Sequence, residues 1–154
     1  MTKTFLLATL ALAATPLAQA YDAEPFTSRK CGISMSIPAG TSDEVEESAG
    51  ADGLCKVDLA VEGVEFHAVT TRDKAVTLAE TEKWVTQYTG IPAAAWKRFD
   101  EGPTHIGYKA SQGGKTVWAA VERGASLACV AFVRAPSGEP EADLEQFYKS
   151  LSCK

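Results

Sequence analysis

Two histidines are the residues through which this sequence could most directly perform acid–base chemistry or hold a metal. His67 lies two positions after Glu65, so in a strand both side chains would project from one face as an acid–base or metal-binding pair. His105 closely follows Asp100 and Glu101, which would allow a carboxylate–histidine contact. A zinc site needs three or four ligands and spacing supplies no third one, so solvated positions are the simpler interpretation of both histidines.

The sequence offers no convincing nucleophile. Ser126 lies in Gly124-Ala125-Ser126-Leu127-Ala128, but a nucleophile elbow needs a strand before the serine and a helix after it, whereas Ser126 opens a predicted strand. Gly113-Gly114 fits a hairpin turn rather than a phosphate-binding loop. Asparagine is absent, which excludes any asparagine-dependent catalytic arrangement. We therefore expect a non-catalytic protein without catalytic residues, cofactor or metal.

Acidic side chains gather in residues 41–55, a stretch without a basic residue. They could bind calcium, contact a basic partner or plug a positively lined active site. Calcium is disfavoured because the ligand order of a calcium-binding loop is absent, and the simplest interpretation is a solvated loop that aids solubility. We predict the contact role for Asp43, Glu44, Glu46 and Glu47; Asp52 also belongs to the stretch.

Trp96 is the tryptophan that we expect to be partly exposed. With Lys97, Arg98 and Phe99 it forms a mixed aromatic and basic patch of the kind enriched at interface centres, so we predict that it contacts a partner. Trp84 and Trp118 are more simply explained as packing residues.

Four cysteines, Cys31, Cys55, Cys129 and Cys153, predict two structural disulfides, because none forms a C-x-x-C pair. Three connectivities are open. Pairing Cys31 with Cys55 and Cys129 with Cys153 would close two loops of equal length, each stabilising by roughly 3 kcal/mol. If the strands that begin at Cys31 and Cys55 form a regular hairpin, however, their starts lie at opposite ends of it, and Cys31 with Cys153 becomes the better pair.

The first 20 of the 154 residues have the features of a cleaved signal peptide: Lys3 near the start, an apolar run over residues 5–14, and Ala18-Gln19-Ala20 at the end. Removing them takes away one of 15 basic and none of 20 acidic residues, which leaves 134 residues with a net charge of −6. This acidic balance disfavours nucleic acid as a partner. No later apolar run is long enough for a membrane span, so we expect a periplasmic or secreted protein.

Residues 21–154 should form one globular domain. Alternating apolar residues predict strands over residues 31–37, 56–61, 64–70, 104–110, 115–122 and 125–134, and residues 41–53 read as a loop. The last of these strands is apolar on both faces and should lie centrally. A capping box and the following Gly90 predict a helix over residues 77–89. A second helix follows Pro140, with Leu144, Phe147, Tyr148 and Leu151 on one face.

This order of elements predicts an α+β fold: an antiparallel β-sheet of about six strands with two helices packed on it, arranged as an α/β/α sandwich. The opening residues 32–38, the mid-chain helix, the meander of strands and the closing residues 144–151 resemble the PsbP-like α/β/α sandwich superfamily. That superfamily includes small exported bacterial proteins. Its members lack a shared catalytic centre and are mostly binding or accessory proteins, so the resemblance implies a binding module without naming its ligand.

The leading hypothesis is an exported, disulfide-stabilised accessory protein that acts through a protein partner. One version is an inhibitor or immunity protein for a toxin, with the acidic segment as the blocking element. The alternatives are a carrier of a small ligand or metal, and a hydrolase that uses carboxylates with His67 or His105. The sequence does not indicate an oligomeric state.

Overall fold

The computed structural model describes residues 22–138 and 141–153. The predicted signal segment, residues 1–20, and Pro140 lie outside the described residues. No helix within the described part of the chain combines the length and the apolar composition that crossing a membrane requires.

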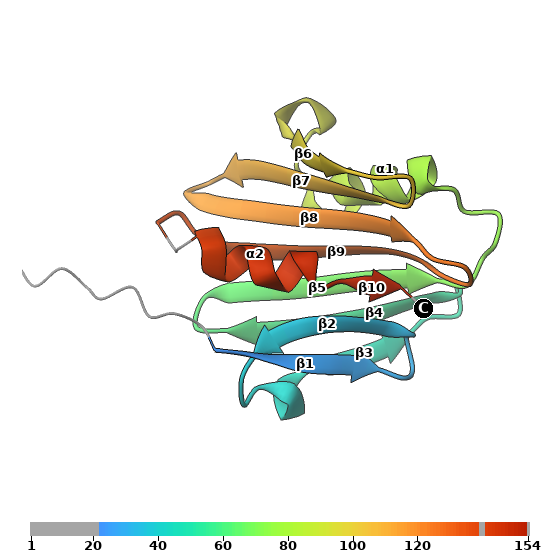
Figure 1. Cartoon of the computed structure of the whole chain (residues 1–154), viewed down its shortest axis with the longest axis horizontal. Coiled ribbons are helices and arrows are strands. Elements are labelled where there is room, and N and C mark those ends of the chain that lie inside the picture. Colours follow the sequence, from blue (N-terminus) through green and yellow to red (C-terminus); the bar gives the residue numbers. More distant parts are fainter. Residues whose placement is uncertain (1–21, 139–140, 154) are drawn as a thin grey trace, which may run out of the picture.

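A seven-stranded antiparallel sheet forms the centre of the molecule (Figure 1). β9 lies in its middle, between β5 and β8, and is buried from Ala128 to Val133, as its two apolar faces predict. In spatial order the strands are β3 (Glu46–Ala49), β4 (Leu54–Val61), β5 (Val64–Thr71), β9 (Ala128–Pro136), β8 (Lys115–Arg123), β7 (His105–Gln112) and β6 (Lys97–Glu101).

Two tight turns fix neighbouring strands of this sheet. Glu62 (φ 49°) and Gly63 (φ 84°) join β4 to β5, and Gly113 (φ 59°) and Gly114 (φ 74°) join β7 to β8. Positive φ at both central residues defines the turn whose twist matches that of a hairpin. The hairpin turn predicted at Gly113-Gly114 is therefore confirmed.

A second sheet of three strands packs on one face of the large sheet (Figure 1). β2 (Ile33–Pro38) lies between β1 (Ala23–Ser28) and β10 (Ser152–Cys153), and both pairings are antiparallel. The predicted strand at residues 31–37 is thus confirmed as β2, but it belongs to a different sheet from β4 and β5.

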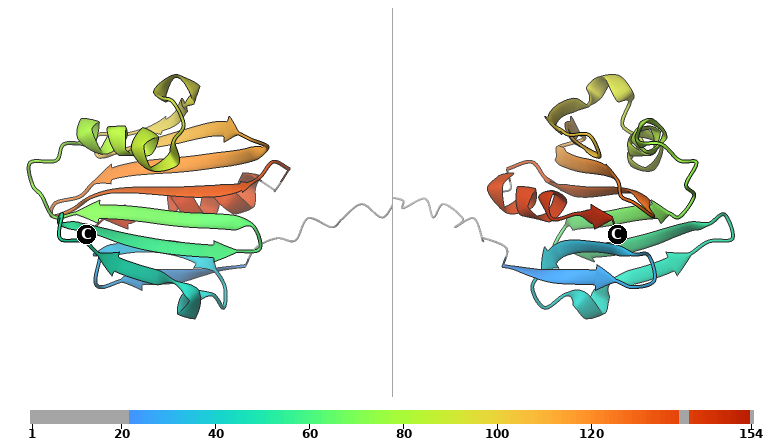
Figure 2. Two further views of the ribbon diagram at one scale, coloured as in Figure 1. Left: turned by 180° about the vertical axis from the view of Figure 1, so that it is seen from behind. Right: turned by 45° about the vertical axis from the view of Figure 1, so that its right-hand side comes forward.

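The two predicted helices cover opposite faces of the large sheet. α1 (Leu78–Thr89) begins at the capping box of Thr77 and Glu80 and ends at Gly90, as predicted. α2 (Glu141–Lys149) lies beside the small sheet, and the two views of Figure 2 show α1 on the other side. Two short 3-10 helices, η1 (Ser42–Glu44) and η2 (Ala93–Ala95), lie in the connections.

Each face of the large sheet has its own apolar core. On the face of the small sheet, Ile33 and Ile37 of β2 and Phe147 of α2 pack against Phe66 and Val133. On the other face, Val85 of α1 packs with residues such as Val121 and Val130. The α+β sandwich is confirmed, with the layer opposite α1 shared between a helix and a small sheet.

The structure contains more strands than the six that we predicted. β1, β3, β6 and β10 were missed, and β9 begins at Ala128 rather than at residue 125. The prediction of an unstructured loop over residues 41–53 is wrong, because η1 and β3 fall within it. The segment shows no apolar periodicity because β3 is an edge strand whose side chains are exposed or half-buried.

The disulfides join Cys31 to Cys55 and Cys129 to Cys153, each across 24 positions, with Cα atoms 5.3 and 6.3 Å apart. The geometric objection to this pairing therefore does not hold. It assumed that the strands beginning at Cys31 and Cys55 are neighbours in a hairpin. They lie in different sheets that face each other, so their starts can meet.

Candidate functional site

The acidic residues predicted to bind a partner lie at the β3 edge of the large sheet. Asp43 and Glu44 are in η1, and Glu46 and Glu47 are in β3. Glu46 is the register partner of Asp58 in β4, so the two carboxylates share one face. Glu47 alternates to the face of the small sheet, where the Lys30 ammonium donates to its backbone oxygen at 3.1 Å.

A hollow of about 260 Å³ opens beside this edge, and we call it the acidic hollow. Among the described residues, no basic side chain forms an ion pair with Asp43, Glu44 or Glu46. Two of the three carboxylates in the hollow, those of Glu44 and Glu46, therefore add negative charge without a basic partner, while the third, that of Asp58, contacts His67. The residues that line the hollow are Glu44, Glu46, Asp58, Leu59, Ala60 and His67.

His67 and Glu65 share a face, as their spacing predicts, but their strongest contacts are with other residues. His67 Nδ1 lies 2.5 Å from Asp58 Oδ1, while its Nε2 is 4.0 Å from Glu65. The ring lies against Phe132, with centroids 4.8 Å apart, and the side chain is only 31% exposed. His67 is thus half-buried rather than solvated, because it bridges the acidic hollow and the core beneath α1.

A cavity of about 230 Å³ lies on the opposite face, over β6, β7 and β8 and beside the end of α2. We call it the β7–β8 cavity. His105 lies on its wall, with Nε2 3.4 Å from Asp100 Oδ1, so the carboxylate–histidine contact considered above is present. Glu122 is the register partner of His105 on β8 and extends the wall. Sequence analysis missed Glu122 and Tyr148 as members of this site.

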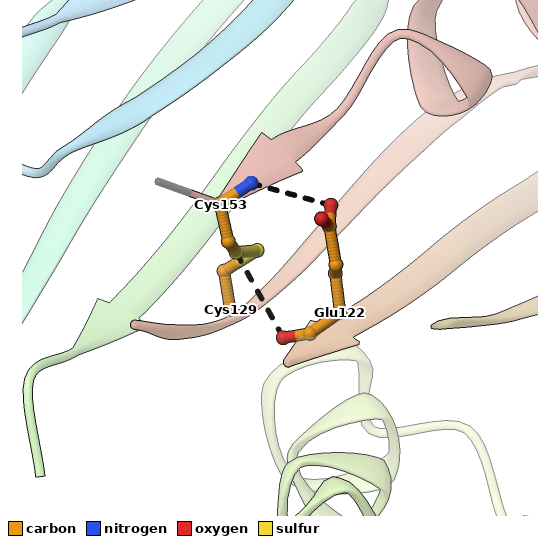
Figure 3. Close-up of side chains that lie close together, drawn as sticks. All are labelled: Glu122, Cys129 and Cys153. Atoms are coloured by element: carbon orange, nitrogen blue, oxygen red, sulfur yellow. Dashed lines mark hydrogen bonds between the residues drawn. A yellow bond between two sulfur atoms is a disulfide. The ribbon is translucent and has the colours of Figure 1, made fainter. Parts of the chain in front are cut away.

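Glu122 also contacts the disulfide between Cys129 and Cys153 (Figure 3). Its Oε2 accepts a hydrogen bond from the Cys153 backbone N–H at 3.2 Å. Burial raises the pKa of the Glu122 carboxyl group, and this hydrogen bond and the nearby His105 oppose the rise. Burial therefore outweighs the two contacts that favour the charged form.

Glu122, Cys129 and Cys153 also form the one group of three potential metal ligands in the described residues whose ligand atoms all lie within 4.8 Å of one another. Because the two sulfur atoms are joined in a disulfide, neither is a thiolate that could bind a metal.

Trp96 is half-buried and has a structural role. Its indole N–H donates to the backbone oxygen of Ile91 at 3.3 Å, and its ring meets Tyr108 edge-on with centroids 6.2 Å apart. Its neighbour Arg98 is exposed, forms ion pairs with Glu82 and Glu101, and covers the Tyr108 ring. A contact between Trp96 and a partner stays a prediction.

Comparisons by sequence find no relative: no family model matches the chain, and no curated protein matches it. The solution structure of cyanobacterial PsbP (CyanoP) from Synechocystis sp. PCC 6803 is similar in fold, with a TM-score of 0.52 and 10% identity, over 92% of this chain and 98% of that one. The chain has a PsbP-like fold.

A crystal structure from Bacteroides thetaiotaomicron VPI-5482 matches with a TM-score of 0.51 and 14% identity, over 84% of this chain. This chain spans only 48% of that protein. At these identities the likeness concerns the fold alone, so the PsbP-like fold does not assign an activity.

Proposed function

We propose that this chain is an exported, non-catalytic accessory protein that binds a basic partner protein through the acidic hollow. The observation that carries the proposal is the convergence of Glu44, Glu46 and Asp58 on one hollow. Glu44 and Glu46 have no basic ion-pair partner among the described residues. A lysine or arginine side chain of a partner would supply the missing charge.

The position of the hollow suits such a contact. It lies at the edge of the large sheet, where η1 and β3 are exposed, so an incoming surface can reach it without displacing a core element. Complementary charges accelerate association and select the partner, and salt weakens them. One form of this function is inhibition of a toxin, in which the acidic segment covers a basic active site.

Two disulfides support the exported part of the proposal, because such bonds persist mainly in oxidising compartments. The PsbP-like fold supports the accessory part only by analogy.

The test is comparative capture of partners from the exported fraction of the source cells. The charge-reversed bait Glu44→Lys/Glu46→Lys should lose the partner recovered by the wild-type chain. Asp22→Lys/Glu62→Lys is the matched control, because it makes the same charge change at two exposed residues outside the hollow. The control should retain the partner. Raising the salt concentration should release the partner from both the wild-type chain and the control. Equal recovery by the wild-type chain and the charge-reversed bait would refute the proposal.

A further inference from the structure

The large sheet ends in two edge strands, β3 and β6, which differ in how they are protected (Figure 1). An edge strand presents backbone N–H and C=O groups that can pair with another strand, and proteins block such edges with bulges, lysine side chains or proline. β6 carries Lys97 and Arg98, and its register shifts between Arg98 and Asp100. β3 contains no basic residue and no proline, and its four residues pair with β4 without a shift. Of these two edges, β3 is therefore the more open to a further strand.

The backbone of β3 directs the polar groups of Glu47 and Ala49 away from β4. The Gly50 N–H donates to the Leu54 C=O at 2.9 Å, so these two residues form a hydrogen-bonded pair at the end of the hairpin. Hydrogen-bonded and non-hydrogen-bonded pairs alternate between antiparallel strands, so Ser48 is the next residue that bonds to β4. The N–H and C=O groups of Glu47 and Ala49 then point out of the sheet.

A contact made by Lys30 agrees with this direction. From the turn between β1 and β2, its ammonium group donates to the backbone C=O of Glu47 at 3.1 Å. A carbonyl oxygen has two lone pairs, so this bond leaves an acceptor site on Glu47. The β3 edge thus retains hydrogen-bonding capacity at both of its outward residues.

The charges around this edge select the kind of strand that can pair with it. η1 and β3 carry four carboxylates, and a second copy of β3 would bring the same four charges beside them, which disfavours pairing between two copies of the chain. A basic strand would instead approach Glu44 and Glu46, which have no basic ion-pair partner among the described residues. The edge therefore favours a strand of opposite charge.

The pairing geometry also defines the pattern of the incoming strand. Directly opposite residues of two antiparallel strands project from the same face of the sheet. Residues opposite Glu46 and Ser48 would lie on the face of the acidic hollow, and residues opposite Glu47 and Ala49 on the face of the small sheet. Basic residues at alternate positions would all reach the acidic hollow, while the residues between them bond to the outward groups of β3.

We propose that the basic partner docks by adding an extended segment to β3 as a further antiparallel strand, with lysine or arginine at alternate positions over the acidic hollow. Antiparallel addition continues the pattern of the large sheet. The charge of the partner rests on the proposed function, and strand addition supplies the mode of contact. Backbone hydrogen bonds give affinity in this mode, and the alternate side chains give specificity.

The probe is the peptide acetyl-Thr-Lys-Thr-Lys-Thr-Lys-Thr-amide, titrated into the disulfide-bonded chain and followed by backbone amide chemical shifts. One analogue is N-methylated at the two inner threonines, whose N–H groups would face β3. The matched control is N-methylated at two lysines, whose N–H groups would face away from the sheet. All three peptides have the same charge, so differences in affinity report backbone pairing.

We expect the threonine-methylated peptide to bind about tenfold more weakly than the lysine-methylated peptide, because only the former loses hydrogen bonds to β3. The amides of Glu47 and Ala49 should become protected from hydrogen exchange in the complex with the unmethylated peptide. Those of Glu46 and Ser48, which already bond to β4, should change little. Equal affinities of the two methylated peptides, or unchanged exchange at Glu47 and Ala49, would overturn strand addition.

Variants of the chain separate strand addition from the charge contact. Ala49→Pro removes one outward N–H, keeps every charge, and places proline where an edge strand tolerates it. It should bind the unmethylated peptide about threefold to tenfold more weakly than Ala49→Gly, which keeps this N–H. If Glu44→Lys/Glu46→Lys abolishes binding while the two Ala49 variants and the two methylated peptides show no difference, strand addition fails and the charge contact stands. Peptide binding that survives Glu44→Lys/Glu46→Lys would count against both.

Discussion

The carboxylate of Glu65 in β5 accepts a hydrogen bond from the Lys115 ammonium in β8 at 2.9 Å, across the intervening strand β9. Arg134 of β9 lies 3.3 Å from the other carboxylate oxygen. The hydrogen bond from Lys115 is the main reason why the pKa of Glu65 lies below its ordinary value of 4.5, and the charges of Lys115, Arg134 and His67 add to the effect. One side chain thus connects three strands at the centre of the sheet.

We predict that Glu65→Gln lowers the free energy of unfolding by about 1 kcal/mol at neutral pH, since it leaves two cations without their carboxylate. A lowered folded pKa gives stability that is present above the unfolded pKa and lost as the pH falls through the folded pKa. The difference from the wild-type chain should therefore shrink as the pH falls below 4.5. Urea denaturation at several pH values measures this difference in the free energy of unfolding. Glu62→Gln, in the exposed β4–β5 turn, serves as the control.

Glu122 should show the opposite pH dependence. Because burial raises its pKa in the folded state, the folded protein takes up a proton more readily than the unfolded chain. Lowering the pH from neutral towards 4.5 should then stabilise the wild-type chain relative to Glu122→Gln. At neutral pH the variant should be at least as stable as the wild type. A loss of stability in Glu122→Gln at neutral pH would mean that the contact with Cys153 outweighs the cost of burying the charge.

The disulfide between Cys31, just before β2, and Cys55 in β4 is one of two covalent links between the small and the large sheet. The other joins Cys129 in β9 to Cys153 in β10. Replacing both Cys31 and Cys55 with alanine should lower the free energy of unfolding by about 3 kcal/mol, the loop-closure estimate for a bond of this span. Denaturation with and without a reductant measures the effect. The reductant should destabilise the wild-type chain more than the variant, which keeps only the bond between Cys129 and Cys153. Equal sensitivity would contradict the prediction.

Trp96→Ala should destabilise the fold by about 2 kcal/mol, because it removes a ring that packs on Tyr108 beside the core beneath α1. Trp96→Phe keeps an aromatic ring and loses only the hydrogen bond to Ile91, so it should cost about 1 kcal/mol. Thermal unfolding of the two variants checks this order. A partner-binding experiment at this position should use the phenylalanine variant, in which the fold is better preserved.

The elements that could be predicted from the sequence are those whose signals are local. The helix at residues 78–89 carries its capping box and its terminal glycine within its own sequence, and the glycine turns at 62–63 and 113–114 fix their hairpins. β6 and β10 have no comparable signal. β6 is exposed along its whole length, and β10 is a strand only because β2 is next to it.

The candidate sites depend on contacts that the sequence does not encode locally. The contact of His105 with Asp100 was considered because five positions separate them, whereas Tyr148 reaches the same cavity from a helix on another layer. Glu44 and Glu46 were selected from composition, but the pairing of Glu46 with Asp58 required the register of β3 against β4. The disulfide pattern stayed open for the same reason: choosing among the pairings required knowing that two sheets face each other.

The small sheet has a consequence for the order of folding. Its central strand β2 lies near the beginning of the described chain, and its partner β10 lies at the other end, so the sheet closes one of the longest loops in the molecule. Non-local pairing of this kind forms slowly, because the entropy of loop closure is lost before the contact is gained. The hairpins β4–β5 and β7–β8 can form early, whereas β2 and β10 can pair only after the rest of the chain has brought them together.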